Sequence, residues 1–153
     1  MLLNIISDVI TKERASKLIQ DCLPQSMKID DPDYSVYSRY DFKSMELSKE
    51  LSKLVPVNFI LGSKFAFTAY DKGGFIRTHT DGHSTVKGQP STHTVLFYLN
   101  DDYTGGELVI SQLGLCIKPP ACSLIIMDQE FSHYVNELTA GHKYVLRVDA
   151  LHS

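Results

Sequence analysis

Residues 65–81 read FAFTAYDKGGFIRTHTD and predict two β-strands, 65–70 and 75–81, joined by a glycine-containing turn. Side chains of a strand alternate between its two faces, so Arg77, His79 and Asp81 share one face of the second strand. An imidazole and a carboxylate placed in this way can bind the same metal ion. The segment therefore predicts both a β-rich fold and a candidate metal site.

Helical spacing is confined to the first third of the chain. One predicted helix begins at the capping residue Thr11 and has an apolar stripe made of Ala15, Leu18, Ile19 and Cys22. A second begins at Ser44, and Pro56 closes its stripe of Leu47, Leu51, Leu54 and Val55. Between them, residues 26–41 are rich in Asp, Ser and Tyr and predict an irregular connection.

Beyond residue 58 the chain consists of short runs rich in β-branched and aromatic residues. Besides 65–70 and 75–81, these are 92–99, 107–110, 115–117, 123–127 and 143–150. Helices followed by dense strands predict an α+β, mainly β fold, a sandwich or jelly roll with the N-terminal helices packed on one sheet. We expect a single domain over residues 1–153, with a helical support region at 1–57 and a jelly-roll core at 58–153.

Composition narrows the class of function. The 15 basic and 18 acidic residues give a net charge of -3, which argues against direct binding to nucleic acid. Three cysteines without a C-x-x-C pair indicate neither a disulfide framework nor a thiolate zinc site. The sequence has no apolar run of about 18 residues and no basic start before its first apolar residues. We therefore expect a soluble, intracellular, cytoplasmic protein without a membrane partner.

A third metal ligand is needed to complete the site of His79 and Asp81. His133 follows a predicted strand and precedes the last one, which is compatible with a neighbouring position in a barrel, and the three residues would form a facial triad with open coordination sites. A lone His-x-Asp pair in a strand is more often a hydrogen-bonded pair than a metal site. A local zinc cluster of His79, Asp81 and His83 is a further alternative.

The last predicted strand places a lysine on an inward face. Alternation puts Lys143 and Arg147 on the side opposite the apolar residues of this strand. A buried ammonium requires an anionic partner, such as a carboxylate. If Tyr98 lies beside Lys143, its hydroxyl would donate a second hydrogen bond to this carboxylate, and Thr94 would lie on the same face of the strand as Tyr98. The alternatives are a lysine that reaches solvent at a strand edge and a core tyrosine bonded to a backbone carbonyl.

In sequence order, these pieces resemble the Fe(II)- and 2-oxoglutarate-dependent dioxygenases, and among them the prolyl 4-hydroxylase-like branch. The matching motifs are the N-terminal strand and helix around residues 4–11, the lead into His-x-Asp at 70–75, Tyr-Leu-Asn at 98–100, Gly-Gly-Glu at 105–107, and residues 133–135 with 141–146. Lys143 follows His133 by ten residues, as the anchor follows the last iron ligand in that family. The likeness covers nearly the whole chain.

The resemblance implies a double-stranded β-helix and assigns roles to single residues. His79, Asp81 and His133 would bind Fe(II), with no catalytic residue beyond these ligands. Lys143 and Tyr98 would hold the distal carboxylate of the co-substrate 2-oxoglutarate, with Arg147 as the second choice for the anchor. Tyr70 and Thr94 would line the same pocket.

The implied reaction is hydroxylation of a C–H bond by O2, with release of succinate and CO2. Its substrate would be a protein side chain, prolyl or other, or an amino-acid-like small molecule, and the resemblance also allows ascorbate as an auxiliary cofactor. The polar segment 82–91, with Gly82, His83 and Ser91, would form a lid over the substrate. Two other readings stay open: a catalytically silent jelly-roll binding module and a cupin-like zinc enzyme.

The sequence departs from the prolyl hydroxylase pattern at two positions. That branch commonly carries a tryptophan six residues after the anchor and an arginine seven residues before the tyrosine of Tyr-Leu-Asn. Here these positions hold Asp149 and Ser91, and the chain contains no tryptophan. The departures do not affect the residues of the oxygenase chemistry. They argue against the apolar surface that holds a proline ring in that branch.

Overall fold

The computed structural model describes residues 3–153, and its two α-helices begin where the sequence predicts. Helix α1 (Lys12–Cys22) is capped by Thr11, whose hydroxyl accepts a 3.0 Å hydrogen bond from the backbone N–H of Arg14. Helix α2 (Met45–Ser52) is capped in the same way by Ser44. It ends before Leu54 and Val55, which the predicted stripe included. None of the described helices is long and apolar enough to cross a membrane.

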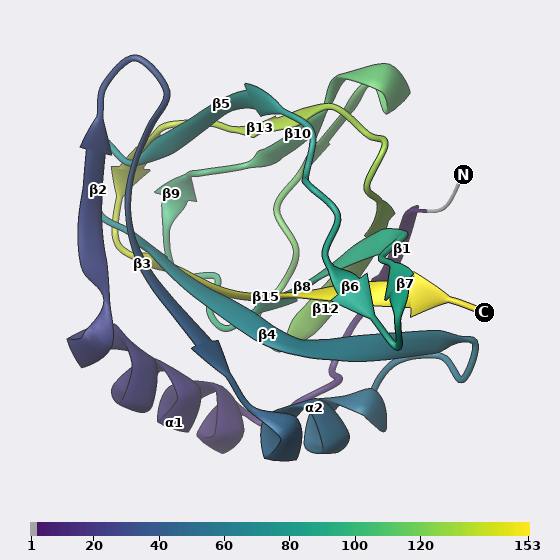
Figure 1. The fold of residues 1–153 in the computed structure, drawn as a ribbon. Helices are drawn as coiled ribbons and strands as arrows, with labels where there is room; N and C mark the ends of the chain where they lie inside the picture. Colours follow the sequence, from purple (N-terminus) through teal and green to yellow (C-terminus); the bar gives the residue numbers. More distant parts are fainter. Residues whose placement is uncertain (1–2) are drawn as a thin grey trace.

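Most of the chain forms one large antiparallel sheet that curls on itself (Figure 1). Its strands are paired in the order β1, β12, β8, β15, β4, β3, β5, β13, β10 and β11, with β2 paired to β3. Their bounds, in that order, are Leu3–Ile6, Ser123–Asp128, His93–Tyr98, Lys143–His152, Phe59–Tyr70, Ser35–Lys43, Phe75–His79, His133–Val135, Leu108–Ile110, Leu115–Ile117 and, for β2, Met27–Asp31. The fold is thus the predicted jelly roll, mainly β, with the helices outside one sheet.

Short elements complete the fold. Strands β6 (Thr85–Val86) and β7 (Gln89–Pro90) pair with each other, as do β9 (Thr104–Gly105) and β14 (Leu138–Ala140). Two 3-10 helices, η1 and η2, span Leu23–Gln25 and Ser111–Leu113. Segment 82–91, predicted to be a polar connection, therefore contains the small β6–β7 hairpin.

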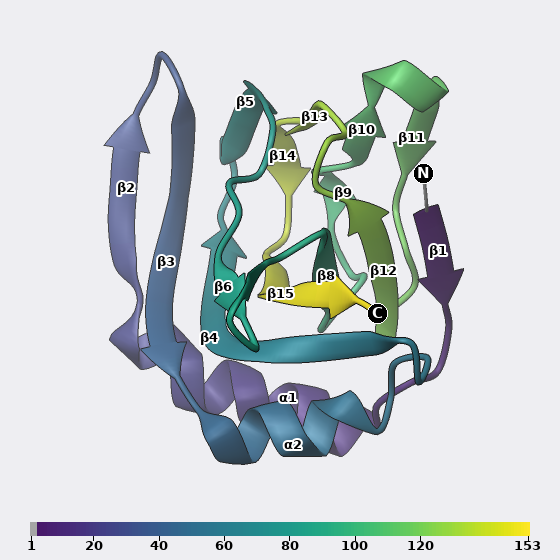
Figure 2. The same cartoon turned by 45° about the vertical axis from the view of Figure 1, so that its right-hand side comes forward.

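Strand alternation divides the core into two apolar clusters. Phe65 and Phe67 of β4 belong to the cluster between the sheet and the helices, with Leu18 of α1 and Leu51 of α2. Tyr70 at the end of the same strand belongs to the second cluster, inside the curled sheet. Figures 1 and 2 show both helices on the outer side of β4. The inner face of β4, β15 and β8 is thereby left free to carry a site.

The prediction of an irregular connection at residues 26–41 is wrong. This segment forms the β2–β3 hairpin, which stands beside the barrel in Figure 2, and Tyr34 closes its turn with a 2.8 Å hydrogen bond to the Asp31 carbonyl. Most of its side chains are exposed or half-buried, so it lacks the apolar alternation by which strands are recognised. The segment forms a strand because β3 pairs with β4 and β5, and its local sequence does not indicate this pairing.

Candidate active site

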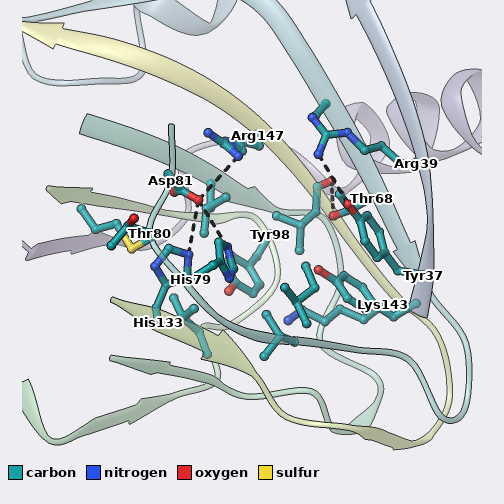
Figure 3. Close-up of a pocket in the computed structure, with 18 of the residues that line it drawn as sticks. Tyr37, Arg39, Thr68, His79, Thr80, Asp81, Tyr98, His133, Lys143 and Arg147 are labelled. Atoms are coloured by element: carbon teal, nitrogen blue, oxygen red, sulfur yellow. Dashed lines mark hydrogen bonds and ion pairs between the residues drawn. The ribbon is translucent and has the colours of Figure 1, made fainter. Parts of the chain in front are cut away.

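Strand pairing brings the three candidate metal ligands together. His79 at the end of β5 lies opposite His133 on β13, and Asp81 follows two residues later. One ligand atom from each residue lies within 4.8 Å of the others. The Nε2 atoms of His79 and His133 are 3.4 and 3.5 Å from the same oxygen, Oδ1 of Asp81 (Figure 3). His83 is not part of this cluster.

Backbone carbonyls orient both imidazoles. Nδ1 of His79 lies 2.7 Å from the carbonyl oxygen of Arg77, and Nδ1 of His133 lies 3.0 Å from that of Phe131. Because a carbonyl only accepts hydrogen bonds, each Nδ1 carries a proton, and Nε2 is the nitrogen that faces Asp81. Each Nε2 can donate a hydrogen bond to Asp81 while it is protonated, and it can coordinate a metal once that proton is lost.

Asp81 is ionised at neutral pH. Its burial raises the pKa of the carboxyl, but hydrogen bonds from His133 and His79 and the charge of Arg147 outweigh burial, so the pKa lies well below its usual range. The hydrogen bond to Asp81 in turn raises the pKa of His79, against the opposing effect of its partial burial. Arg147 places Nη1 3.6 Å from Oδ1 of Asp81 and Nη2 3.1 Å from Oδ1 of Asp149.

A chain of buried hydrogen bonds holds the second oxygen of Asp81. The hydroxyl of Thr94, which is fully buried on β8, donates a 2.7 Å hydrogen bond to Oδ2 of Asp81. Gln129 donates to the Thr94 hydroxyl at 3.3 Å and accepts at 2.8 Å from Ser91, which accepts at 3.0 Å from the backbone N–H of Ser84. Thr94 therefore lies behind the carboxylate and is not among the residues that line the pocket.

We expect Thr94→Val to weaken metal binding about 10- to 100-fold, because losing a hydrogen bond that orients a metal ligand has typically this effect. Valine keeps the shape of threonine, whereas Thr94→Ser keeps the hydroxyl and should bind metal like the wild type. Titration of the two variants with Mn(II), read by calorimetry, measures the difference. Equal affinities in both variants would show that this hydrogen bond does not position Asp81.

Lys143 lies at the opposite end of the same interior. It is 1% exposed, and its ammonium donates a 2.6 Å hydrogen bond to the carbonyl of Gly106. It also stands 4.9, 5.4 and 5.9 Å from the ring centres of Tyr70, Tyr98 and Tyr103. Gly106, at φ +69°, permits this approach, because a Cβ there would lie 3.4 Å from Cδ of Lys143 and 3.0 Å from a Leu138 methyl.

Two buried groups at this end lack enough partners. An ammonium has three donors, and Lys143 uses one of them within the described chain. Within residues 3–153, the hydroxyl of Tyr103 is buried and has no hydrogen-bond partner. A carboxylate in the pocket would satisfy the ammonium, since its oxygens accept several hydrogen bonds, whereas Tyr103 is not among the residues that line the pocket. Sequence reasoning missed Tyr103, for which the only signal is its position between the Tyr-Leu-Asn and Gly-Gly-Glu motifs.

Burial lowers the pKa of Lys143 to about 7, although the charge of Glu107 acts in the opposite direction. If the protonated amine holds an anion, affinity for a dicarboxylic acid should fall as the pH rises above 7, by about fivefold between pH 7 and pH 8. Calorimetric titration of the metal-loaded protein with 2-oxoglutarate across this range measures the change. In Lys143→Arg, where the charge persists, the profile should be flat.

A cavity of about 270 Å³ connects the two ends. The residues labelled in Figure 3 that line it are Tyr37, Arg39, Thr68, His79, Thr80, Asp81, Tyr98, His133, Lys143 and Arg147. Tyr70 also lines it and stacks on Tyr37 with ring centres 5.6 Å apart. Tyr37 and Arg39 were missed because they come from the β2–β3 hairpin, which the sequence did not predict.

The predicted lid residues differ in their surroundings. Gly82 is buried and lines the cavity, whereas the His83 side chain is 48% exposed, with Nδ1 2.7 Å from the Ser91 carbonyl oxygen. Ser91 is 1% exposed and bonded to Gln129, so its side chain is directed into the protein. Ser91 therefore cannot take over the substrate contact that an arginine at its position could make.

Comparison with known proteins identifies the family. The model of the 2OG-Fe(II) oxygenase superfamily matches residues 65–148, more than half of the chain, and so the chain belongs to this superfamily. It is a 2-oxoglutarate-dependent dioxygenase, with Fe(II) and 2-oxoglutarate as cofactors and O2 as the other co-substrate. The comparison with curated proteins gave no match.

Solved structures of prolyl hydroxylases share the fold. The viral collagen prolyl hydroxylase of Paramecium bursaria Chlorella virus-1, in complex with 2-oxoglutarate, is 15% identical, with a TM-score of 0.76 over 98% of this chain and 96% of that one. A Pseudomonas putida prolyl-4-hydroxylase is 14% identical (TM-score 0.74; 99% and 92% covered). A Trichoplax adhaerens prolyl hydroxylase bound to a peptide fragment of hypoxia inducible factor is 16% identical (TM-score 0.75; 98% and 83%). The fold of the chain is thus prolyl 4-hydroxylase-like.

The donor groups fit both cofactors. Two imidazole nitrogens and one carboxylate oxygen are the ligand set of non-haem Fe(II) oxygenases, which leaves coordination positions open. The partly satisfied ammonium of Lys143, at the other end of the cavity, fits one carboxylate of a dicarboxylic acid. The Arg147 guanidinium lies instead beside Asp81, which favours Lys143 as the anchor.

Proposed function

We propose that this chain hydroxylates a C–H bond of a protein side chain or of an amino-acid-like small molecule. In the balanced reaction, one O2 oxidises one 2-oxoglutarate and one substrate, giving succinate, CO2 and the alcohol. The observation that carries the proposal is the placement of three ligand atoms within 4.8 Å of one another in a cavity that also contains the buried ammonium of Lys143. One end of the cavity suits a metal, and the other suits a carboxylate.

Each residue has a role that follows from its contacts. Nε2 of His79, Nε2 of His133 and Oδ1 of Asp81 hold the iron, which when bound supplies the oxidising chemistry with O2 and 2-oxoglutarate. Thr94 fixes the other oxygen of Asp81. Lys143 holds the distal carboxylate of 2-oxoglutarate, with the hydroxyl of Tyr98, which also lines the cavity, as a further donor.

Apolar side chains line the cavity between its two polar ends. They are Ile76, Leu96, Leu108, Met127, Val135 and Val145. Excluding water from this space strengthens the electrostatic interactions inside it and protects the reactive species. The segment 82–91, which contributes Gly82 to the cavity, would cover the bound substrate as a lid.

The mouth of the cavity favours a polar substrate over a proline ring. Asp149 occupies the position of the family's tryptophan and pairs with Arg147 at 3.1 Å. Ser91, at the position of the family's arginine, is buried. Charged groups at a mouth complement a polar or charged molecule, whereas a proline ring gains most from an apolar wall.

The test is succinate formation by the wild type in the presence of Fe(II), 2-oxoglutarate and O2, with each left out in turn. We expect slow succinate formation without substrate, faster formation with substrate, and none when one component is missing. Binding of 2-oxoglutarate without any succinate would instead support the silent binding module. An activity that needs neither O2 nor the oxo acid would support the zinc enzyme.

A further inference from the structure

A second cavity, of about 460 Å³, adjoins the mouth of the active-site cavity. The two cavities share Arg39, Ala66 and Arg147, so a molecule that reaches the metal site can extend into the second one. Residues of β3, β4 and β15 line it, together with Ser84. Four basic residues line this groove: Arg39, Lys43, Lys64 and Arg147.

Two of these basic residues have no acidic partner. Arg39 and Arg147 are each paired with an aspartate two residues along the same strand, at 2.7 and 3.1 Å. Lys43 and Lys64, by contrast, form no ion pair with any residue of the described chain 3–153. The groove therefore has an excess of positive charge, although the whole chain has a net charge of -3.

The register of the sheet places the two lysines without an acidic partner next to each other. Lys43 lies directly opposite Lys64 across β3 and β4, and both are exposed. Like charges in directly opposite positions destabilise an antiparallel pair. An anionic group between the two ammonium groups would convert this repulsion into attraction. Such a pair on the floor of a groove that leads to the active site indicates a binding position for an anion.

We propose that the groove binds an extended, acidic peptide segment of the substrate, with the hydroxylated residue at the mouth of the active-site cavity. Carboxylates of the peptide lie on Lys43 and Lys64. This inference rests on the proposed function and specifies its substrate as a protein with acidic residues beside the target. The charge of the groove disfavours a cationic substrate.

The spacing of the groove suits an extended peptide. Lys64 of β4 pairs with Lys43 of β3. Two residues further along β4, Ala66 lies between Asp41 of β3 and Arg147 of β15. Two residues of a strand span about 7 Å, the same distance that separates alternate side chains of an extended peptide. Ala66 is small and leaves room above the floor. One acidic side chain of the peptide would thus meet Lys43 and Lys64, while the side chain two positions along would lie over Ala66.

The test uses fluorescein-labelled octapeptides with alternating glutamate and alanine, and matched peptides in which glutamine or lysine replaces glutamate. Fluorescence anisotropy measures their binding to the wild type loaded with Fe(II) and 2-oxoglutarate under anaerobic conditions. We expect the glutamate peptide to bind about tenfold more tightly than the glutamine peptide, and to lose affinity as salt is added. The double variant Lys43→Gln/Lys64→Gln should lose about fivefold or more of this affinity.

The control is Lys53→Gln/Lys72→Gln, which removes the same charge at two exposed lysines outside the groove and should leave peptide affinity unchanged. Equal binding of the glutamate and glutamine peptides, or an unchanged affinity in Lys43→Gln/Lys64→Gln, would overturn the inference. So would displacement of the glutamate peptide by inorganic phosphate as effectively as by unlabelled peptide, because the groove would then be a site for small anions.

Failure of this inference and failure of the proposed function have different signatures. Peptide binding is measured without turnover, whereas the proposed function is measured by succinate formation in the wild type. A protein that forms succinate but does not prefer the acidic peptide would refute the groove alone. A protein that binds the acidic peptide in the groove but forms no succinate would refute the dioxygenase reaction on which the inference rests.

Discussion

His133→Ala should abolish succinate formation and lower the affinity for Fe(II) more than a hundredfold. Replacing a residue that only hydrogen-bonds to a metal ligand typically lowers metal affinity 10- to 100-fold. The expected loss of affinity is larger here because a ligand itself is removed. His133 is 5% exposed, and its Nε2 faces Oδ1 of Asp81 at 3.5 Å. Anaerobic calorimetry gives the metal affinity, and chromatography of the reaction mixture gives succinate.

The matched control is His152→Ala, which removes an exposed histidine that is bonded to Asn58 and does not line the cavity. It should bind iron and form succinate like the wild type. His83→Ala should retain metal affinity, since His83 lies outside the cluster of ligand atoms. A His133→Ala protein that still binds iron tightly, combined with loss of binding in His83→Ala, would contradict the ligand set and favour the local zinc cluster.

Strand periodicity accounts for what could be predicted from the sequence. Alternation along residues 143–150 predicts that Lys143 and Arg147 share an inward face, and both line the cavity in the structure. Along residues 75–81 the predicted alternation is wrong, because the pairing of β5 with β13 contains a register shift and β5 ends at His79. Ile76 therefore lines the cavity together with His79, whereas Arg77 does not. The prediction for the last strand holds because one buried face fixes the register of a strand, and a shift by one residue would expose every apolar side chain. The caps at Thr11 and Ser44 are equally local signals, and both are confirmed.

The features of the site that could not be predicted from the sequence depend on contacts between residues far apart in the chain. Arg39 reaches the cavity only because β3 pairs with β4, and the segment around it lacks apolar alternation. Gln129 supports Thr94 across 35 positions of the sequence, so no local pattern indicates that Thr94 lies behind Asp81. The proximity of Lys43 and Lys64 likewise follows from register, which residue composition does not determine.

Lys143→Met should abolish binding of 2-oxoglutarate and, at the same time, stabilise the protein without its co-substrate. Methionine fills about the same volume but has no ammonium to hold a carboxylate. Burial lowers the pKa of Lys143 from 10.5 to about 7, so folding at neutral pH must overcome the cost of either burying the charge or releasing the proton. Replacing such a buried charge by an apolar residue should stabilise the fold by about 2–4 kcal/mol.

The sign of the pH dependence makes this prediction specific. Between pH 7 and pH 10.5 the unfolded chain holds a proton on Lys143 that the folded chain has released, so wild-type stability gains from each rise in pH across this window. The amount by which Lys143→Met is more stable than the wild type should therefore be largest below pH 7 and decrease towards pH 10. Urea unfolding of both proteins at several pH values measures it. A variant less stable than the wild type at pH 6 would mean that the hydrogen bond from Lys143 to Gly106 outweighs the cost of burying the ammonium.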